Sequence, residues 1–216
     1  MTKNALILAT DIIEQAQHSG RRAGTSLEAI ASEQGDETML AVLTEMDILT
    51  VAKIVREHDA TIPSIATWLM DAESIKQLLN VEPSYWQSMD EDSVFCAQTE
   101  AHNLLTQIFL SSDQDEEKQL EILAAIVEDD FGLLYLSLPF VGHDFSELEE
   151  DEEQTSGSVE ELLMKIKTLS EEAYREVMTV SSNGTLANIE NSLKQNANKQ
   201  RVTAVEMDTD DMFAPL

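Results

Sequence analysis

Two histidine–aspartate pairs, His58-Asp59 and His143-Asp144, come nearest to a catalytic motif in this sequence. A neutral imidazole and a carboxylate can together hold a divalent metal, and a bound metal can activate water for hydrolysis. The other two histidines, His18 and His102, have no aspartate beside them. The chemistry worth testing first is therefore metal-assisted hydrolysis at the two pairs.

These pairs resemble the metal-binding dipeptides of HD-type phosphohydrolases, a resemblance that implies a divalent-metal hydrolase. In that family apolar residues usually precede the pair and a glycine follows closely. Here Glu57 precedes the first pair and Ala60 follows it, and the second pair borders an acidic run. We therefore expect surface or helix-capping histidines, with no metal and no cofactor.

Other reactive side chains lack a partner at useful spacing. Cys96 is the only cysteine, which excludes an internal disulfide and a thiolate metal cluster. Its nearest histidine, His102, is off the helical neighbour spacing, so we expect Cys96 to be a small core residue rather than a nucleophile. Glu128, Asp129 and Asp130 lack the ligand spacing of an EF-hand loop. The sequence predicts a protein that is not an enzyme.

Negative charge is concentrated in the middle of the chain. The 216 residues hold 42 acids and 13 bases, a formal net charge of −29. Between Glu57 and Glu161 there are 26 acids and two bases, a net of −24. Such a field repels nucleic acid and anionic membranes and favours cationic partners. Solubility, or a salt-rich environment, is the second explanation that the composition leaves open.

The composition favours helices, because 43% of the residues are hydrophobic and there are only 7 Gly and 4 Pro. We predict an all-α protein, either an irregular bundle or a short helical-repeat array. Apolar periodicity predicts helices over Asn4–Ser19, Met39–Val55, Val94–Leu110, Glu116–Leu138 and Val159–Val180. In the first of these, Leu6, Ile7, Ile13 and Ala16 recur at helical spacing. Thr25 with Glu28 fits a capping box, and the apolar run from Gly132 to Val141 is predicted to be a buried helix, with a strand as the alternative.

Two Pro-Ser restarts, at Pro63 and Pro83, lead to Trp68 and Trp86. Together with Tyr85 these tryptophans could form a recognition patch, although aromatic residues at helical spacing indicate a core. The segment from Thr38 to Val141 resembles helical repeats of the N-terminal domain of bacterial magnesium transporters and of flagellar motor switch proteins. That resemblance implies a helical scaffold that binds other proteins, and it rests on no motif that would assign a site.

We divide the chain into a helical core domain (1–143), an acidic linker (144–158), an amphipathic helical segment (159–196) and a disordered acidic tail (197–216). Ser158 with Glu161 forms a capping-box pattern at the start of the amphipathic segment. Its apolar seam, which includes Leu162 and Ile166, predicts packing against the core or against a second copy in a homo-oligomer.

The C-terminal end, from Glu206, places acids before an apolar tip of Met212, Phe213, Pro215 and Leu216. The pattern is similar to the C-terminal tip of bacterial single-stranded-DNA-binding proteins, which recruits partners and ends in Pro-Phe rather than Pro-Leu. Acids can steer a peptide toward a basic surface, where an aromatic anchor fills a pocket. A docking tip with Phe213 as its anchor and an incidental apolar end are both open.

Function follows from these patterns as a hypothesis. We predict a non-catalytic protein–protein interaction protein, an adaptor, chaperone or regulator, whose acidic surface meets a basic partner. The alternative is a nucleic-acid mimic that inhibits a DNA-binding protein. No apolar run approaches the roughly 18 residues of a membrane span, and Asp11 and Glu14 interrupt any signal-peptide pattern. A cytoplasmic bacterial protein is expected.

Overall fold

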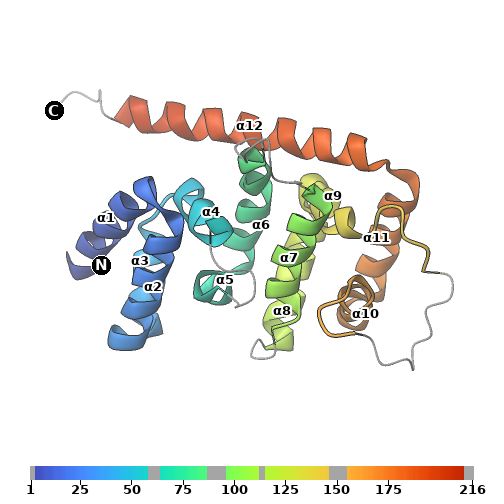
Figure 1. Ribbon diagram of the computed structural model, residues 1–216, viewed down its shortest axis with the longest axis horizontal. Helices are drawn as coiled ribbons and strands as arrows, with labels where there is room; N and C mark the ends of the chain where they lie inside the picture. Colours follow the sequence, from blue (N-terminus) through green and yellow to red (C-terminus); the bar gives the residue numbers. More distant parts are fainter. Residues whose placement is uncertain (1–2, 58–63, 87–95, 112–114, 146–154, 212–216) are drawn as a thin grey trace.

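The computed structural model describes residues 3–57, 64–86, 96–111, 115–145 and 155–211, with side chains up to Val202 (Figure 1). Within these ranges the chain forms twelve α-helices, two short 3-10 helices and no strand. The all-α prediction is confirmed. None of these helices is both long and apolar enough to cross a bilayer.

The helices follow one another with short connections. They are α1 (Lys3–His18), α2 (Gly20–Gln34), α3 (Asp36–Thr44), α4 (Ile48–Glu57), α5 (Ile65–Leu69), α6 (Ala72–Val81), η1 (Glu82–Tyr85), α7 (Ala97–Phe109), α8 (Glu116–Val127), α9 (Asp130–Ser137), η2 (Leu138–Phe140), α10 (Val159–Leu169), α11 (Glu171–Asn183) and α12 (Leu186–Asp211).

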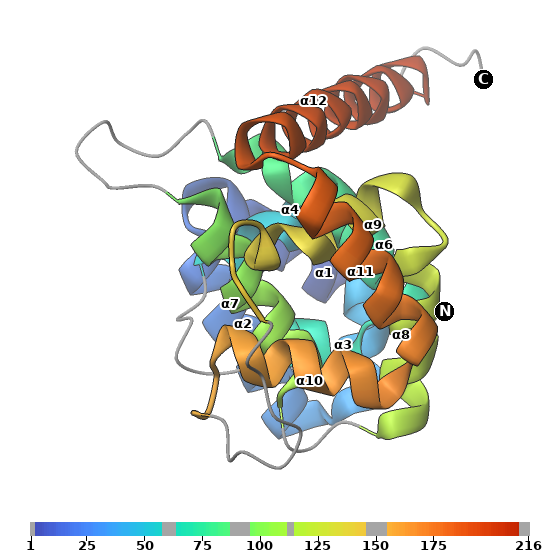
Figure 2. The same cartoon turned by 90° about the vertical axis from the view of Figure 1, so that its right-hand side faces the viewer.

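Helix α6 lies at the centre of the molecule and contacts α4, α8, α9 and α12 (Figure 1). Its side chains Ile75, Leu78 and Leu79 are fully buried, so one short helix joins the two halves of the core. Helices α1 to α4 lie on one side of it and α7 to α11 on the other. The long helix α12 forms an outer layer across the ends of the others (Figure 2).

Helix α1 buries a different face from the one its large apolar residues suggest. Ala5, Ala9, Ile12 and Ala16 form the buried face. Leu6 and Ile7 are 58% and 53% exposed. Small side chains let helix axes approach closely, and α1 packs against α2, α3 and α4 through its alanines.

Three helices predicted as continuous are each broken by a capping side chain. Asp47 accepts a hydrogen bond from the Thr50 amide (2.9 Å) and so starts α4. Asp129 accepts from the Gly132 amide (2.7 Å) and starts α9. Ser170 accepts from the Ala173 amide (3.2 Å) and starts α11. Such caps satisfy amides that a helix start leaves without an intrahelical partner. The predictions of single helices over 39–55, 116–138 and 159–180 were wrong at these points.

The start of α2 also differs from the prediction. Ser19 caps it by accepting from the Arg22 amide (3.3 Å), so the pattern of Thr25 and Glu28 falls inside the helix and is no cap. Gly20 opens α2 because a Cβ there would lie 2.6 Å from the carbonyl oxygen of Lys53. This close approach joins α2 to α4.

Two other local predictions are confirmed. The run from Gly132 to Val141 is the helix α9 followed by the 3-10 turn η2, which contains Pro139, and is no strand. Ser158 caps α10 by accepting from the Glu161 amide (3.1 Å), while the Glu161 carboxylate accepts from the Gly157 amide.

The amphipathic segment belongs to the same core as the rest of the chain. Leu162 and Ile166 are fully buried and pack in one apolar cluster that extends from Ala5 to Leu193. Helix α12 then continues to Asp211, so the prediction of disorder was wrong from 197 up to that residue. Its helix is held there by packing: Ala197 is fully buried, and the Arg201 guanidinium lies 5.8 Å from the Tyr85 ring centre. Residues 146–154 of the predicted linker lie outside the described residues.

A buried charge network joins α4 to the helices that follow it. The Arg56 guanidinium pairs with Glu82, whose side chain is 5% exposed. The Tyr135 hydroxyl donates to the other carboxylate oxygen at 3.0 Å. Burial raises the pKa of Glu82, while Arg56 and Tyr135 oppose that rise. Burial and the neighbouring carboxylate raise the pKa of Tyr135 well above its ordinary value, so its hydroxyl stays protonated and donates.

We expect Tyr135→Phe to lower the free energy of unfolding by about 1.5–3 kcal/mol, because a hydrogen bond to a charged group is lost and a buried carboxylate oxygen is left unsatisfied. Urea denaturation followed by circular dichroism measures this. Glu73→Gln, in an exposed pair, is the control and should leave the midpoint unchanged. Equal midpoints for Tyr135→Phe and wild type would contradict the prediction.

The α10 seam gives a second test. Leu162→Ala should cost about 2–5 kcal/mol, because it leaves a cavity at a fully buried site. Leu120→Ala in α8, where the side chain is 44% exposed, should cost much less. The two denaturant midpoints are compared in one buffer, and similar losses would show that the seam is not the tighter packing site.

Candidate functional site

The sequence-predicted metal residues are scattered over the fold. His18 and His143 are exposed at different helix ends, and His143 stacks on Phe145 with ring centres 5.6 Å apart. His102 lies beside Thr106 in α7 (3.4 Å). The pair His58-Asp59 falls outside the described residues. In the part of the chain that the structure describes, no three His, Cys, Asp or Glu side chains are grouped to hold a metal ion.

The remaining candidates for chemistry have local structural roles. Asp129 caps α9 and also accepts from Asn80 (3.2 Å). Cys96 is partly buried at the N-cap of α7 rather than in the core, and hydrogen bonds from Thr99 lower the pKa of its thiol. These side chains organise helix ends.

The aromatic residues serve the core more than a surface. Trp86 is 3% exposed and lies 6.0 Å from Tyr135, ring centre to ring centre. Tyr85 donates from its hydroxyl to the carbonyl oxygen of Leu49 (2.8 Å). Trp68 is half-buried, and its carbonyl accepts from Lys118. The core interpretation is confirmed for Trp86.

The proposed contact residues of the sequence also have places. Leu162 and Ile166 are buried within the chain itself, so in this fold they are covered before any partner arrives. Met212, Phe213, Pro215 and Leu216 lie outside the described residues.

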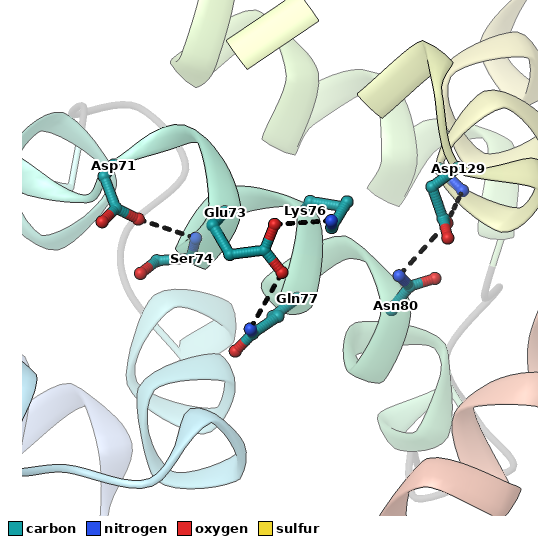
Figure 3. A network of polar contacts seen from close by, with 8 residues as sticks. Asp71, Glu73, Ser74, Lys76, Gln77, Asn80 and Asp129 are labelled. Atoms are coloured by element: carbon teal, nitrogen blue, oxygen red, sulfur yellow. Dashed lines mark hydrogen bonds and ion pairs between the residues drawn. The ribbon is translucent and has the colours of Figure 1, made fainter. Parts of the chain in front are cut away.

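A chain of polar contacts follows α6 (Figure 3). Asp71 accepts from the Ser74 amide (2.8 Å), and Glu73 accepts from Gln77 (3.1 Å). Glu73 also pairs with Lys76. The hydrogen bond with Glu73 is the main cause that raises the pKa of Lys76. The polar side chains of α6 are therefore largely engaged with one another.

That polar edge borders a first groove, between α3, α4 and the start of α6. The groove has a volume of 270 Å³ and an apolar floor that includes Leu43, Met46 and Met70. Asp71, Ser74 and Gln77 line its edge, and the contacts above already use the polar atoms of all three. This groove offers apolar surface with little unmet polar capacity.

A second groove lies between α8 and α11 and has a volume of 330 Å³. Apolar side chains line it: Leu120, Leu123, Ala124, Val127 and Ala173. Three carboxylates, Glu128, Glu172 and Glu176, stand around them. Ser170, the cap of α11, closes one end. This combination of apolar surface and negative charge makes it the candidate site.

The carboxylates of this second groove have no ion-pair partner among the described residues. Nearby cations are engaged elsewhere: Lys165 lies 3.5 Å from Glu116, and Arg175 lies 3.1 Å from Glu171. No basic residue lines the groove. Its negative charge is therefore available to a cation from outside the chain.

Fold and groove together define an all-helical protein with an apolar, acid-edged surface groove. The chain belongs to the AtcB family: the AtcB N-terminal domain matches residues 1–69 and the AtcB C-terminal domain matches residues 72–208. Adaptation to cold protein B of Shewanella oneidensis MR-1 is 34% identical over 159 residues, which cover 69% of this chain and 63% of that relative. The chain thus spans less than two thirds of the relative's length. No solved structure matches it.

This membership corrects the resemblance to magnesium transporters and flagellar motor switch proteins, because neither family matches. That resemblance rested on Pro-initiated helices and alternating leucines and acids. Any irregular helical array needs helix starts and amphipathic faces, so the pattern identifies a fold class and no family.

Sequence analysis missed the groove. Leu120 and Leu123 were assigned together to one apolar stripe, and Glu128 was considered only as part of a possible cation site. The acids at 172 and 176 carried no signal in so acidic a chain. The cap at Ser170, directly before two glutamates, was the available sign that a new helix begins there and brings these acids opposite α8.

The cap of α6 gives a test with a pH dependence. Hydrogen bonds from Ser74 lower the pKa of Asp71 below 3.8, its ordinary value. Its stabilising contribution is therefore present above that pH and is lost as pH falls through the folded-state pKa. Asp71→Ala should cost about 1 kcal/mol at neutral pH, and its difference from wild type should shrink in acid. Asp71→Asn keeps a capping oxygen and should stay near wild type at neutral pH. Urea titrations of the three proteins across pH would contradict this if the Ala difference grows in acid.

Proposed function

We propose that this chain is a non-catalytic interaction protein that binds a positively charged part of a protein partner in the groove between α8 and α11. The observation that carries the proposal is the set of three carboxylates without an ion-pair partner beside exposed apolar surface. Complementary charge raises the rate of encounter and selects partners, while apolar contact supplies residence time.

The apolar surface favours this function over nucleic-acid mimicry. A mimic presents carboxylates that replace phosphates, and its contacts are made by the partner's cations. Leu120 is 44% exposed at the groove, and burying it needs apolar side chains from the partner. The acid run at 147–153, where mimicry would concentrate its charge, lies outside the described residues.

The name of the Shewanella relative, which speaks of adaptation to cold, suggests when such binding matters. Apolar burial weakens on cooling. An interface that combines apolar contact with ion pairs depends less on that burial, so it retains more of its affinity in the cold. We place the binding activity of this chain in growth at low temperature.

The test compares two triple variants that change the net charge equally. The groove variant carries Glu128→Gln, Glu172→Gln and Glu176→Gln; the control carries Glu14→Gln, Glu33→Gln and Glu37→Gln on α1 to α3. Each tagged chain is expressed in its native cell at low temperature and purified with its partners. We expect a protein partner that wild type and control recover and the groove variant loses.

That partner is then purified and titrated against the chain at low and high salt. Affinity should fall with salt, because ion pairs at an exposed rim are screened. Equal recovery of every partner by the groove variant would overturn the proposal. Recovery of a DNA-binding protein that DNA displaces would favour mimicry instead.

A further inference from the structure

The α8 wall of the groove is a straight apolar stripe. Leu120, Leu123 and Val127 recur at helical spacing and line the groove together. At a rise of about 1.5 Å per residue the stripe is roughly 10 Å long, about two turns of helix. Leu123 is 1% exposed and Leu120 is 44% exposed, so the surface rises from a buried floor to an open rim.

The α11 wall is short and carries its charge on one side. Ala173 is 4% exposed at the floor, and its small side chain leaves room for an incoming one. Glu172 and Glu176 are four residues apart, so they lie on the same face of α11. Like charges at this spacing destabilise a helix, and a cation placed between them removes that repulsion.

The third carboxylate stands at the other wall. Glu128 follows the last residue of α8 and is exposed. Negative charge at a helix C-terminus is unfavourable, because the helix dipole is negative there. A partner cation at Glu128 therefore meets both a carboxylate and the end of a helix dipole.

We infer that the α8–α11 groove takes an amphipathic helical segment of a partner, whose apolar residues at i, i+3 or i+4 and i+7 lie along α8 and whose Lys or Arg residues pair with Glu128, Glu172 and Glu176. This inference rests on the proposed function and names the shape of its partner. A helix in an apolar groove buries one stripe and leaves its flanks polar, which suits a floor two turns long with acids at its edges.

A second copy of this chain is a poor occupant. Each copy carries a formal net charge of −29, and like-charged surfaces repel on approach. A basic segment of another protein meets the opposite field. The groove therefore selects a hetero-partner.

The probe is a synthetic peptide of about 14 residues, designed as a helix with leucines on one stripe and lysines on its flanks. The first control peptide has the same composition in scrambled order, and the second replaces the lysines with glutamates. Full-length chain, labelled with ¹⁵N, is titrated with each peptide, and calorimetry gives the affinities. We expect the amphipathic basic peptide to bind and to shift the amides of 116–128 and 170–177 most. Both control peptides should bind much more weakly.

The two triple variants described above separate site from net charge. The groove variant should bind the peptide about tenfold more weakly, the combined effect of three exposed pairs, while the control variant stays within about twofold of wild type. Leu120→Asp should also weaken binding, because it places a charge on the apolar stripe. Circular dichroism melts confirm that each variant is folded.

Equal binding of ordered and scrambled peptides, equal losses in both triple variants, or shifts centred away from α8 and α11 would each overturn the inference. The proposed function fails by a different result, when the groove variant still recovers every native partner. If the native partner is lost by the groove variant yet no peptide binds, the helical-segment inference is wrong and the proposed function stands.

Discussion

Glu82 has its side chain almost wholly removed from water between the guanidinium of Arg56 and the hydroxyl of Tyr135. An ionised carboxylate in such a place is unstable unless a cation and hydrogen-bond donors compensate it. Arg56 belongs to the part matched by the AtcB N-terminal domain, and the other two residues belong to the C-terminal one. The network therefore fixes the two parts of the fold against each other, since any separation would leave a buried charge unpaired.

Helix α6 transmits that constraint to the rest of the molecule. It leads directly into Glu82, and its buried side chains contact α4 and α8 on opposite sides. Asn80, at its C-terminal end, bonds to Asp129 and accepts from Asn196 (3.3 Å). These contacts tie the start of α9 and the outer helix α12 to the same short segment. The position of α8, and hence one wall of the groove, follows from α6.

The groove shows how a strongly acidic chain can gain specificity from charge. Most carboxylates of this protein only add to the overall field. Those at Glu128, Glu172 and Glu176 are different because two helices hold them around apolar surface, without ion pairs from the described residues. Charge that is fixed in position can distinguish partners, whereas diffuse charge mainly speeds encounter. The same carboxylates cost some helix stability, which is the expected consequence of keeping them for a ligand.

Sequence alone determined the helical class, the helix of 132–141 and the cap at Ser158, because periodicity and capping act within a few neighbouring residues. It also located the negative charge and the seam of Leu162 and Ile166. Tertiary structure decided which apolar residues are covered, burying alanines of α1 and leaving Leu6 exposed. It also brought Arg56 to Glu82, and α11 to α8, across 26 and about fifty residues of chain. Such pairings depend on how whole helices pack, which no local pattern encodes, so the candidate site emerged only from the fold.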